Sequence, residues 1–125
     1  MLVIPITFSL KVTAQNTVPG TKIKTITEYN RNNKKKEIDH ITTLNAEGLK
    51  TEEVEYFSDG IVKTRTDYEY DHQKRCIKAT KYGIKGKVEK VTTYDYDSNG
   101  TKTRESILIP EKRYRKDKIF EYTYY

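Results

Sequence analysis

The chain has 125 residues, enough for one small domain, and only 34% of them are hydrophobic. Another 34% are charged, so the chain cannot fill a thick apolar core. Eleven tyrosines and three phenylalanines argue against a disordered chain, because disordered segments are poor in aromatic residues. The net charge of +6 comes from basic and acidic residues that are mixed along most of the sequence, as on a solvated β surface. We therefore expect a thin sheet or a thin sandwich.

Residues 1–14 have a different character from the rest. The apolar run Leu2–Leu10 is too short to span a bilayer. Val12-Thr13-Ala14 places small residues at −3 and −1 of a possible cleavage before Gln15, which predicts a secretory signal peptide over 1–14, although the usual basic n-region is missing. No cysteine follows the run, so we do not expect a lipoprotein. The alternative is a first β-strand over Leu2–Val12.

Residues 15–21 are expected to form a linker, with a turn signal at Pro19-Gly20. From there to the end of the chain, turn signals recur at nearly regular intervals, and no stretch has the i, i+3, i+4 apolar spacing of a helix over three turns. Residues 22–125 are therefore predicted to form a single all-β domain. It would be an antiparallel meander of about seven or eight strands, arranged as an open twisted sheet or a thin sandwich. The predicted strands are 22–29, 38–44, 49–57, 61–70, 75–82, 87–96, 101–109 and 113–125, with a polar loop over 30–36.

Two strands and two turns make up one repeat of about 26 residues. Its clearest copy is TTYDYDSNGTKT, Thr92–Thr103, in which Asn99-Gly100 supplies the positive-φ residues of a tight hairpin turn. Residues that are one repeat apart are equivalent, and we call each set of equivalent positions a row. One row is Thr42, Tyr68, Tyr94 and Phe120, and a second is Leu44, Tyr70, Tyr96 and Tyr122. A third row is Tyr56, Tyr82 and Leu108.

Strict alternation gives the predicted sheet a tyrosine-rich face and a charged face. The first would carry Val62, Tyr68, Tyr70, Ile77, Ala79, Val88, Tyr94 and Tyr96. The second would carry Arg65, Asp67, Glu69, Lys78, Glu89, Lys102 and Arg104. A bulge at any turn would exchange the faces of the strand that follows it.

The stretch Tyr96-Asp97-Ser98-Asn99-Gly100, with weaker copies ending at Gly48 and Lys74, resembles the YD repeats of the RHS (rearrangement hot spot) family. The pattern is also similar to MORN-type repeats. Both families are arrays of β-hairpins, and the resemblance implies an exported, cell-surface or periplasmic sheet that binds a partner. About four repeats are too few for the toxin-enclosing shells of large RHS proteins.

The sequence contains no recognisable catalytic or metal-binding motif. His40 and His72 fall in a predicted strand and a predicted turn, no Cys/His/carboxylate cluster has metal-ligand spacing, and there is no G-x-S-x-G or phosphate-binding P-loop motif. The alternation Asp95, Asp97, Asn99 is similar to the start of a calcium loop, but Ser106 stands where the twelfth-position glutamate belongs, so these residues are interpreted as turn caps. We predict no enzymatic activity, no cofactor and no metal. The lone Cys76 permits no intramolecular disulfide.

The tyrosine rows and one basic run are the candidate binding residues. Aromatic faces can stack on sugars or bases, and lysines can hold phosphate or sulfate. The candidates are Tyr68, Tyr70, Tyr94, Tyr96, Phe120, Tyr122, Lys34, Lys35 and Lys36. The alternative is that the tyrosines are the core of the sheet and the lysines a solvated loop.

Three functions remain open from the sequence. The first is an exported structural or protein-interaction module of the cell envelope or extracellular space. The second is a module that binds carbohydrate, in particular anionic polysaccharide. The third, which the apparent signal peptide disfavours, is an intracellular nucleic-acid-binding or antitoxin-like protein.

Overall fold

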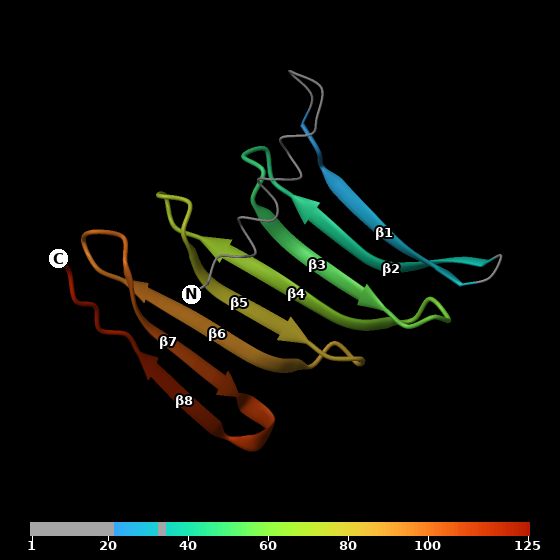
Figure 1. Cartoon of the computed structure of the whole chain (residues 1–125). Helices are drawn as coiled ribbons and strands as arrows, with labels where there is room; N and C mark the ends of the chain where they lie inside the picture. The colour runs from blue at the N-terminus through green and yellow to red at the C-terminus, as the bar shows by residue number, and fades with distance from the viewer. Residues whose placement is uncertain (1–21, 33–34) are drawn as a thin grey trace. The chain divides into compact units, whose positions relative to one another are not determined.

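A computed structural model describes residues 22–32 and 35–125 of the chain. Eight strands follow one another as an antiparallel meander in the order β1 to β8, which forms an open sheet with β1 and β8 as its edges (Figure 1). The strands are β1 (Thr25–Asn32), β2 (Lys35–Leu44), β3 (Lys50–Tyr56), β4 (Val62–Tyr70), β5 (Cys76–Tyr82), β6 (Val88–Tyr96), β7 (Lys102–Ile109) and β8 (Tyr114–Ile119). The all-β meander is thus confirmed, with the sheet open. The expected signal peptide (1–14), the linker (15–21) and Lys34 lie outside the described residues.

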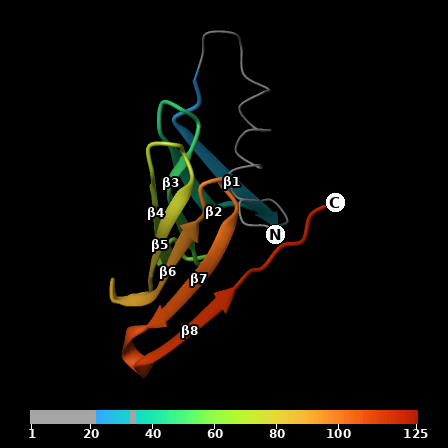
Figure 2. The ribbon, with the colours of Figure 1, turned by 90° about the vertical axis from the view of Figure 1, so that its left-hand side faces the viewer.

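The chain divides into two compact units. The first ends at Asp67 and contains β1, β2, β3 and most of β4, while the second runs from Tyr68 to Tyr125 and contains β5 to β8. In the second unit the strands lie side by side, and β8 runs along β7 in both views (Figure 2).

The hairpin turns share one geometry, which explains their regular spacing. In the second unit the turns are 71–75, 83–87 and 97–101, and in the first they are 45–49 and 57–61. In each turn the amide of the first residue donates to the carbonyl of the fifth, and the amide of the fourth donates to the carbonyl of the first. The fourth residue always has a positive φ, for example +82° at Gly100. These two hydrogen bonds and the positive φ of the fourth residue are typical of short hairpin loops, which need a left-handed residue at that position.

Lys74 is the exception among these left-handed positions, since it has a φ of +66° where the other four turns carry glycine. A side chain with a Cβ is strained in this region. Lys74→Gly is therefore expected to raise the free energy of unfolding by about 0.5–1 kcal/mol. Urea denaturation would check this, with Gly100→Lys as the reciprocal variant that should lose about 1 kcal/mol. A lower stability of Lys74→Gly would show that the lysine side chain contributes more than its backbone costs.

The turns 45–49, 57–61, 83–87 and 97–101 are each accompanied by a shift in register, and this shift corrects part of the face assignment. In the β6–β7 hairpin Asp95 pairs with Arg104 but Tyr96 pairs with Lys102, and in the β5–β6 hairpin Lys81 pairs with Lys90 but Tyr82 pairs with Val88. One extra residue therefore bulges from the strand after each of these four turns.

The prediction of strict alternation was wrong at four positions for this reason. In the β3–β4 hairpin Glu55 pairs with Thr64 but Tyr56 pairs with Val62, so Val62 leaves the face that carries Thr64. Lys102 lies on the tyrosine face, with its Nζ 5.5 Å from the centre of the Tyr94 ring. Glu89 forms an ion pair with Lys81, at 3.7 Å, on the side that was predicted for the tyrosines. Val88 pairs with Tyr82 on the opposite side.

The other corrections concern element ends. The predicted loop 30–36 is replaced by strand up to Asn32 and again from Lys35. The last strand ends at Ile119 and not at Tyr125, although the amide of Phe120 still donates to the carbonyl of Thr103 at 3.0 Å. A 3-10 helix that the sequence pattern did not indicate, η1 (Pro110–Lys112), connects β7 to β8, where Pro110 cannot donate to the sheet.

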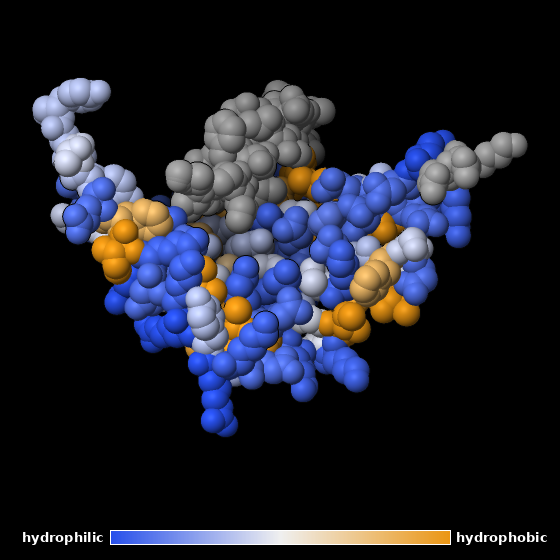
Figure 3. Space-filling model, turned by 60° about the horizontal axis from the view of Figure 1, so that its bottom comes forward, coloured by the Kyte–Doolittle hydropathy of each residue, from blue (hydrophilic) through white to orange (hydrophobic). Residues whose placement is uncertain are grey.

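Burial is shallow throughout the described residues. The buried hydrophobic side chains among them are Leu44 and Leu49, both in the first unit. In the second unit the buried positions are small and polar: Thr80, Thr92 and Ser106. Apolar side chains consequently appear on the surface as separate patches between polar ones (Figure 3). The half-buried aromatic side chains must therefore supply much of the packing in the second unit.

Candidate functional site: aromatic rings and cations on the second unit

The largest cluster of predicted site residues lies where β6 and β7 meet, beside the 97–101 turn. Lys102 points its Nζ between two rings, 4.5 Å from the centre of Phe120 and 5.5 Å from that of Tyr94. The same Nζ is 3.0 Å from Oε1 of Glu105. The side chains of Lys102 and Glu105 are only 11% and 17% exposed, so water screens this pair weakly. We call these four residues the Lys102 cluster.

A second cation covers the neighbouring ring. The guanidinium carbon of Arg75 is 4.7 Å from the centre of the Tyr96 ring, within the range of a cation–π interaction. Nε of Arg75 donates to Oδ2 of Asp71 at 2.8 Å, which fixes the guanidinium in place. The ring face of Tyr96 is therefore occupied by a side chain of its own unit.

The tyrosine hydroxyls also have partners in the sheet. Tyr96 donates its hydroxyl hydrogen to the carbonyl of Cys76 at 2.6 Å, and Tyr122 donates to the carbonyl of Lys102 at 2.7 Å. Tyr96 thereby links β6 to β5, and Tyr122 links the segment after β8 to β7. These tyrosines thus tie neighbouring parts of the sheet together, as expected if they form the core.

Burial keeps the hydroxyls of Tyr94 and Tyr96 protonated. It raises the pKa of Tyr96 to about 12, and the nearby Cys76 adds to the rise, whereas Arg75 opposes it. Burial likewise raises the pKa of Tyr94, with further contributions from Cys76 and Glu105. Both side chains therefore act as neutral hydrogen-bonding groups at physiological pH.

The remaining candidates are dispersed. Tyr68 and Tyr70 lie at the end of β4 and are half-buried. Lys35 and Lys36 belong to β2 in the first unit, where Lys35 lies 3.4 Å from Glu37 and Lys36 lies over the ring of Tyr29 at 4.0 Å. The structure thus assembles Tyr94, Tyr96, Phe120 and Tyr122 into one region, and Lys35 and Lys36 belong to a separate unit.

Sequence reasoning missed the cations and the carboxylate that complete the cluster. The repeat could have indicated them, because Lys102 and Glu105 stand two repeats after Lys50 and Glu53. That earlier pair forms the same contact in the first unit, with Lys50 Nζ 3.2 Å from Glu53 Oε1. The copy of the repeat between these two pairs has Cys76 and Ala79 at the equivalent positions. This copy therefore has two small uncharged residues in place of the ion pair.

The acidic residues that resembled a calcium loop are turn caps and ion-pair partners. Oδ1 of Asp97 accepts hydrogen bonds from the amides of Asn99 and Thr101, both at 2.9 Å. Oδ2 of Asp95 accepts from Nε of Arg104 at 2.7 Å. Within the residues that the structure describes, no group of three His, Cys, Asp or Glu side chains is placed to hold a metal ion.

The corresponding turn cap, Asp71, is expected to make the stability of the fold depend on pH in the acidic range. Burial raises the pKa of Asp71, but hydrogen bonds from the amides of Arg75 and Gln73 and from the Arg75 side chain outweigh it, so the pKa lies below its usual value. This group stabilises the fold above its unfolded-state pKa of about 3.9, and the contribution is lost as the pH falls through the lower folded-state value. Asp71→Asn keeps an Oδ1 acceptor, as Asn45 does in its own turn.

We therefore expect this variant to lose less stability than wild type between about pH 4 and pH 2, which urea titrations at several pH values would measure. Asp95→Asn is the control, since Asp95 does not cap a turn. An acid profile of Asp71→Asn identical to that of wild type would contradict the prediction.

Comparisons with known proteins leave the function open. No protein-family model matches the chain, and no curated protein matches it. Among solved structures, a chain of a GtfA/B complex bound to UDP and GlcNAc is similar over 84% of this chain, at 13% identity and a TM-score of 0.32. This chain spans 25% of the length of that one. In the described part of the chain no helix is long and apolar enough to cross a membrane.

Proposed function

We propose that this chain is a non-enzymatic β-sheet module that binds another protein in the cell envelope or extracellular space. One observation carries the proposal: aliphatic side chains lie exposed on the second unit among charged ones. Ile84 is 62% exposed, Leu108 41% and Val88 37%. Aliphatic or aromatic anchors surrounded by a polar rim are typical of protein interfaces. In contrast, Tyr94 and Tyr96 of the same unit have a cation against the ring, and the hydroxyl of Tyr96 is bonded to the carbonyl of Cys76.

Export and the relation to RHS or MORN-type hairpin repeats belong to the same proposal. Three Asx-capped turns start at Asn45, Asp71 and Asp97, one repeat apart, and have the same backbone hydrogen bonds, which supports a hairpin array. Mass spectrometry of the protein from its native host is expected to find a mature N-terminus at Gln15. An intact N-terminus on the cytoplasmic protein would remove the exported role.

Photo-crosslinking tests the protein-binding role directly. A benzophenone amino acid is placed at Ile84 or Leu108, which are exposed aliphatic positions, and at Ser98 as an exposed polar control. We expect a discrete, protease-sensitive adduct from at least one aliphatic position and none from Ser98. Protease-resistant adducts at every position would instead indicate a glycan ligand.

Binding of anionic polysaccharide is the second candidate, and it is favoured by a pair in the first unit. Tyr29 is 48% exposed and carries Lys36 over its ring, so an aromatic face and an ammonium group are presented together. A glycan array at about 0.15 M salt would favour this role if binding exceeded that of a charge-matched control protein.

A further inference from the structure

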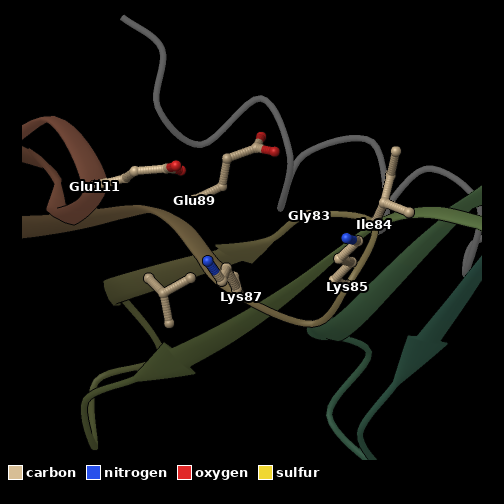
Figure 4. A pocket seen from close by; sticks show the side chains of 7 residues that line it. Gly83, Ile84, Lys85, Lys87, Glu89 and Glu111 are labelled. Carbon is tan, nitrogen blue, oxygen red and sulfur yellow. The ribbon is translucent and has the colours of Figure 1, made fainter.

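The β5–β6 turn and η1 enclose a shallow hollow at the end of the second unit opposite the Lys102 cluster. The hollow has a volume of about 300 Å³, and Gly83, Ile84, Val88 and Glu111 are among its lining residues. A smaller hollow of about 230 Å³ adjoins it and shares Glu89 and Glu111. In Figure 4, Glu89 and Glu111 project to the same side of the ribbon, and Lys85 and Lys87 flank the turn.

Lysines dominate this end of the unit. Those that line the two hollows are Lys81, Lys85, Lys87, Lys90 and Lys112, here called the lysine rim, against the two glutamates Glu89 and Glu111. Residues 68–125 contain fourteen Lys and Arg and nine Asp and Glu, a net charge of +5 of the +6 of the whole chain. The excess positive charge of the protein is therefore concentrated in the second unit, and much of it surrounds the hollow.

The rim is poorly neutralised by the chain itself. Lys81 lies 3.7 Å from Glu89, but in the described residues Lys85, Lys87, Lys90 and Lys112 form no ion pair. Lys81 and Lys90 are also direct cross-strand partners, an arrangement in which like charges destabilise a sheet. A negatively charged ligand would relieve this repulsion, so the rim complements an anionic partner.

The apolar lining of the hollow decides which kind of anion fits. Ile84 and Val88 are its aliphatic lining residues, and Ile84, at 62% exposure, is the more accessible of the two. An aliphatic side chain offers no flat π-face on which a sugar or a base could stack. It can, however, receive an apolar side chain of a peptide, which is the usual anchor of a protein interface. The combination matches a segment in which acidic residues flank an apolar one.

We propose that the lysine rim and the exposed side chain of Ile84 bind an extended acidic segment of a partner protein through carboxylates and one apolar side chain. This site rests on the proposed protein-binding function and names the chemistry of the partner. Carboxylates contact Lys85, Lys87 and Lys112, and the apolar side chain contacts Ile84. Glu89 and Glu111 limit how many acidic residues the hollow accepts, which gives the site selectivity over a uniformly charged polymer.

A fluorescein-labelled peptide of alternating glutamate and leucine is a suitable probe, with affinity measured by fluorescence anisotropy at about 0.15 M salt. Lys85→Glu/Lys87→Glu is expected to weaken binding about tenfold, because two attractions become repulsions. Lys22→Glu/Lys24→Glu makes the same change in net charge in the first unit, where both lysines are exposed, and should change affinity less than about twofold.

Ile84→Ser should weaken binding about fivefold, whereas Ile61→Ser, at an exposed turn position of the first unit, should have no effect.

Four results would overturn the site. Equal effects of the two double variants would reduce binding to net charge. Equal effects of the two isoleucine variants would remove the apolar anchor. Displacement of the peptide by a heparin oligosaccharide or oligothymidylate at the same or lower concentration would assign the rim to a polyanion. A protein adduct at Leu108 with none at Ile84 in the photo-crosslinking experiment would keep the proposed function and still exclude this site.

Discussion

Tyr96→Ala is expected to lower the free energy of unfolding by about 3 kcal/mol, in the range found for large-to-small replacement of packed aromatic residues. The side chain is half-buried on a thin sheet, carries Arg75 over its ring at 4.7 Å and donates its hydroxyl to the carbonyl of Cys76. The loss combines transfer of the ring to water with a carbonyl left without its partner. Urea denaturation followed by tyrosine fluorescence or circular dichroism would measure it.

Two tyrosine-to-phenylalanine variants separate the ring from the hydroxyl. Tyr96→Phe should cost about 1 kcal/mol, since it removes one part-buried hydrogen bond. Tyr122→Phe removes the same kind of bond at a side chain that is 45% exposed, and should cost less. If Tyr96→Ala left the midpoint of unfolding unchanged, the tyrosine face would be available to a ligand, and the candidate binding residues on β6 would regain priority.

The fold was predictable because its turns are local. Each turn is set by an Asx or glycine close by in the sequence, such as Asp97 and Gly100, and the backbone hydrogen bonds of the turn depend on little else. The alternation of aromatic and β-branched residues between the turns then leaves few alternatives to an antiparallel meander. The strand limits therefore agree with the structure within a few residues up to Ile109.

The details of the site were less predictable, because they depend on the bulge after each turn. A single extra residue moves Lys102 from the charged face to the rings of Tyr94 and Phe120. It also carries Glu89 to Lys81. The addition of Glu111 and Lys112 to the lysines around the β5–β6 turn becomes visible only when η1 is placed beside β6. The alternation of hydrophobic and polar residues does not show where an extra residue is inserted. The repeat does give an indication, because Lys102 occupies the position of Lys50, which forms the same ion pair in the first unit.

That correspondence predicts strong energetic coupling between Lys102 and Glu105. Glu105→Ala leaves an ammonium group that is 11% exposed with only ring faces as partners, and should cost about 2 kcal/mol. Lys102→Cys leaves Glu105 with Lys118 at 3.7 Å and should cost about 1.5 kcal/mol. The double variant recreates the Cys76 and Ala79 combination of the preceding copy, so the sheet should accommodate it with a loss of only about 1–2 kcal/mol.

A double-mutant cycle in urea would measure this coupling as the difference between the double variant and the sum of the single variants, expected at about 1.5–2.5 kcal/mol. The cross-strand pair of Asp95 and Arg104 is the control: its atoms are 2.7 Å apart, but its side chains are 51% and 46% exposed. Solvent screening should hold the coupling of that pair below about 1 kcal/mol. Additive losses at Lys102 and Glu105 would mean that the two residues contribute independently, and that shielding from water does not strengthen their ion pair.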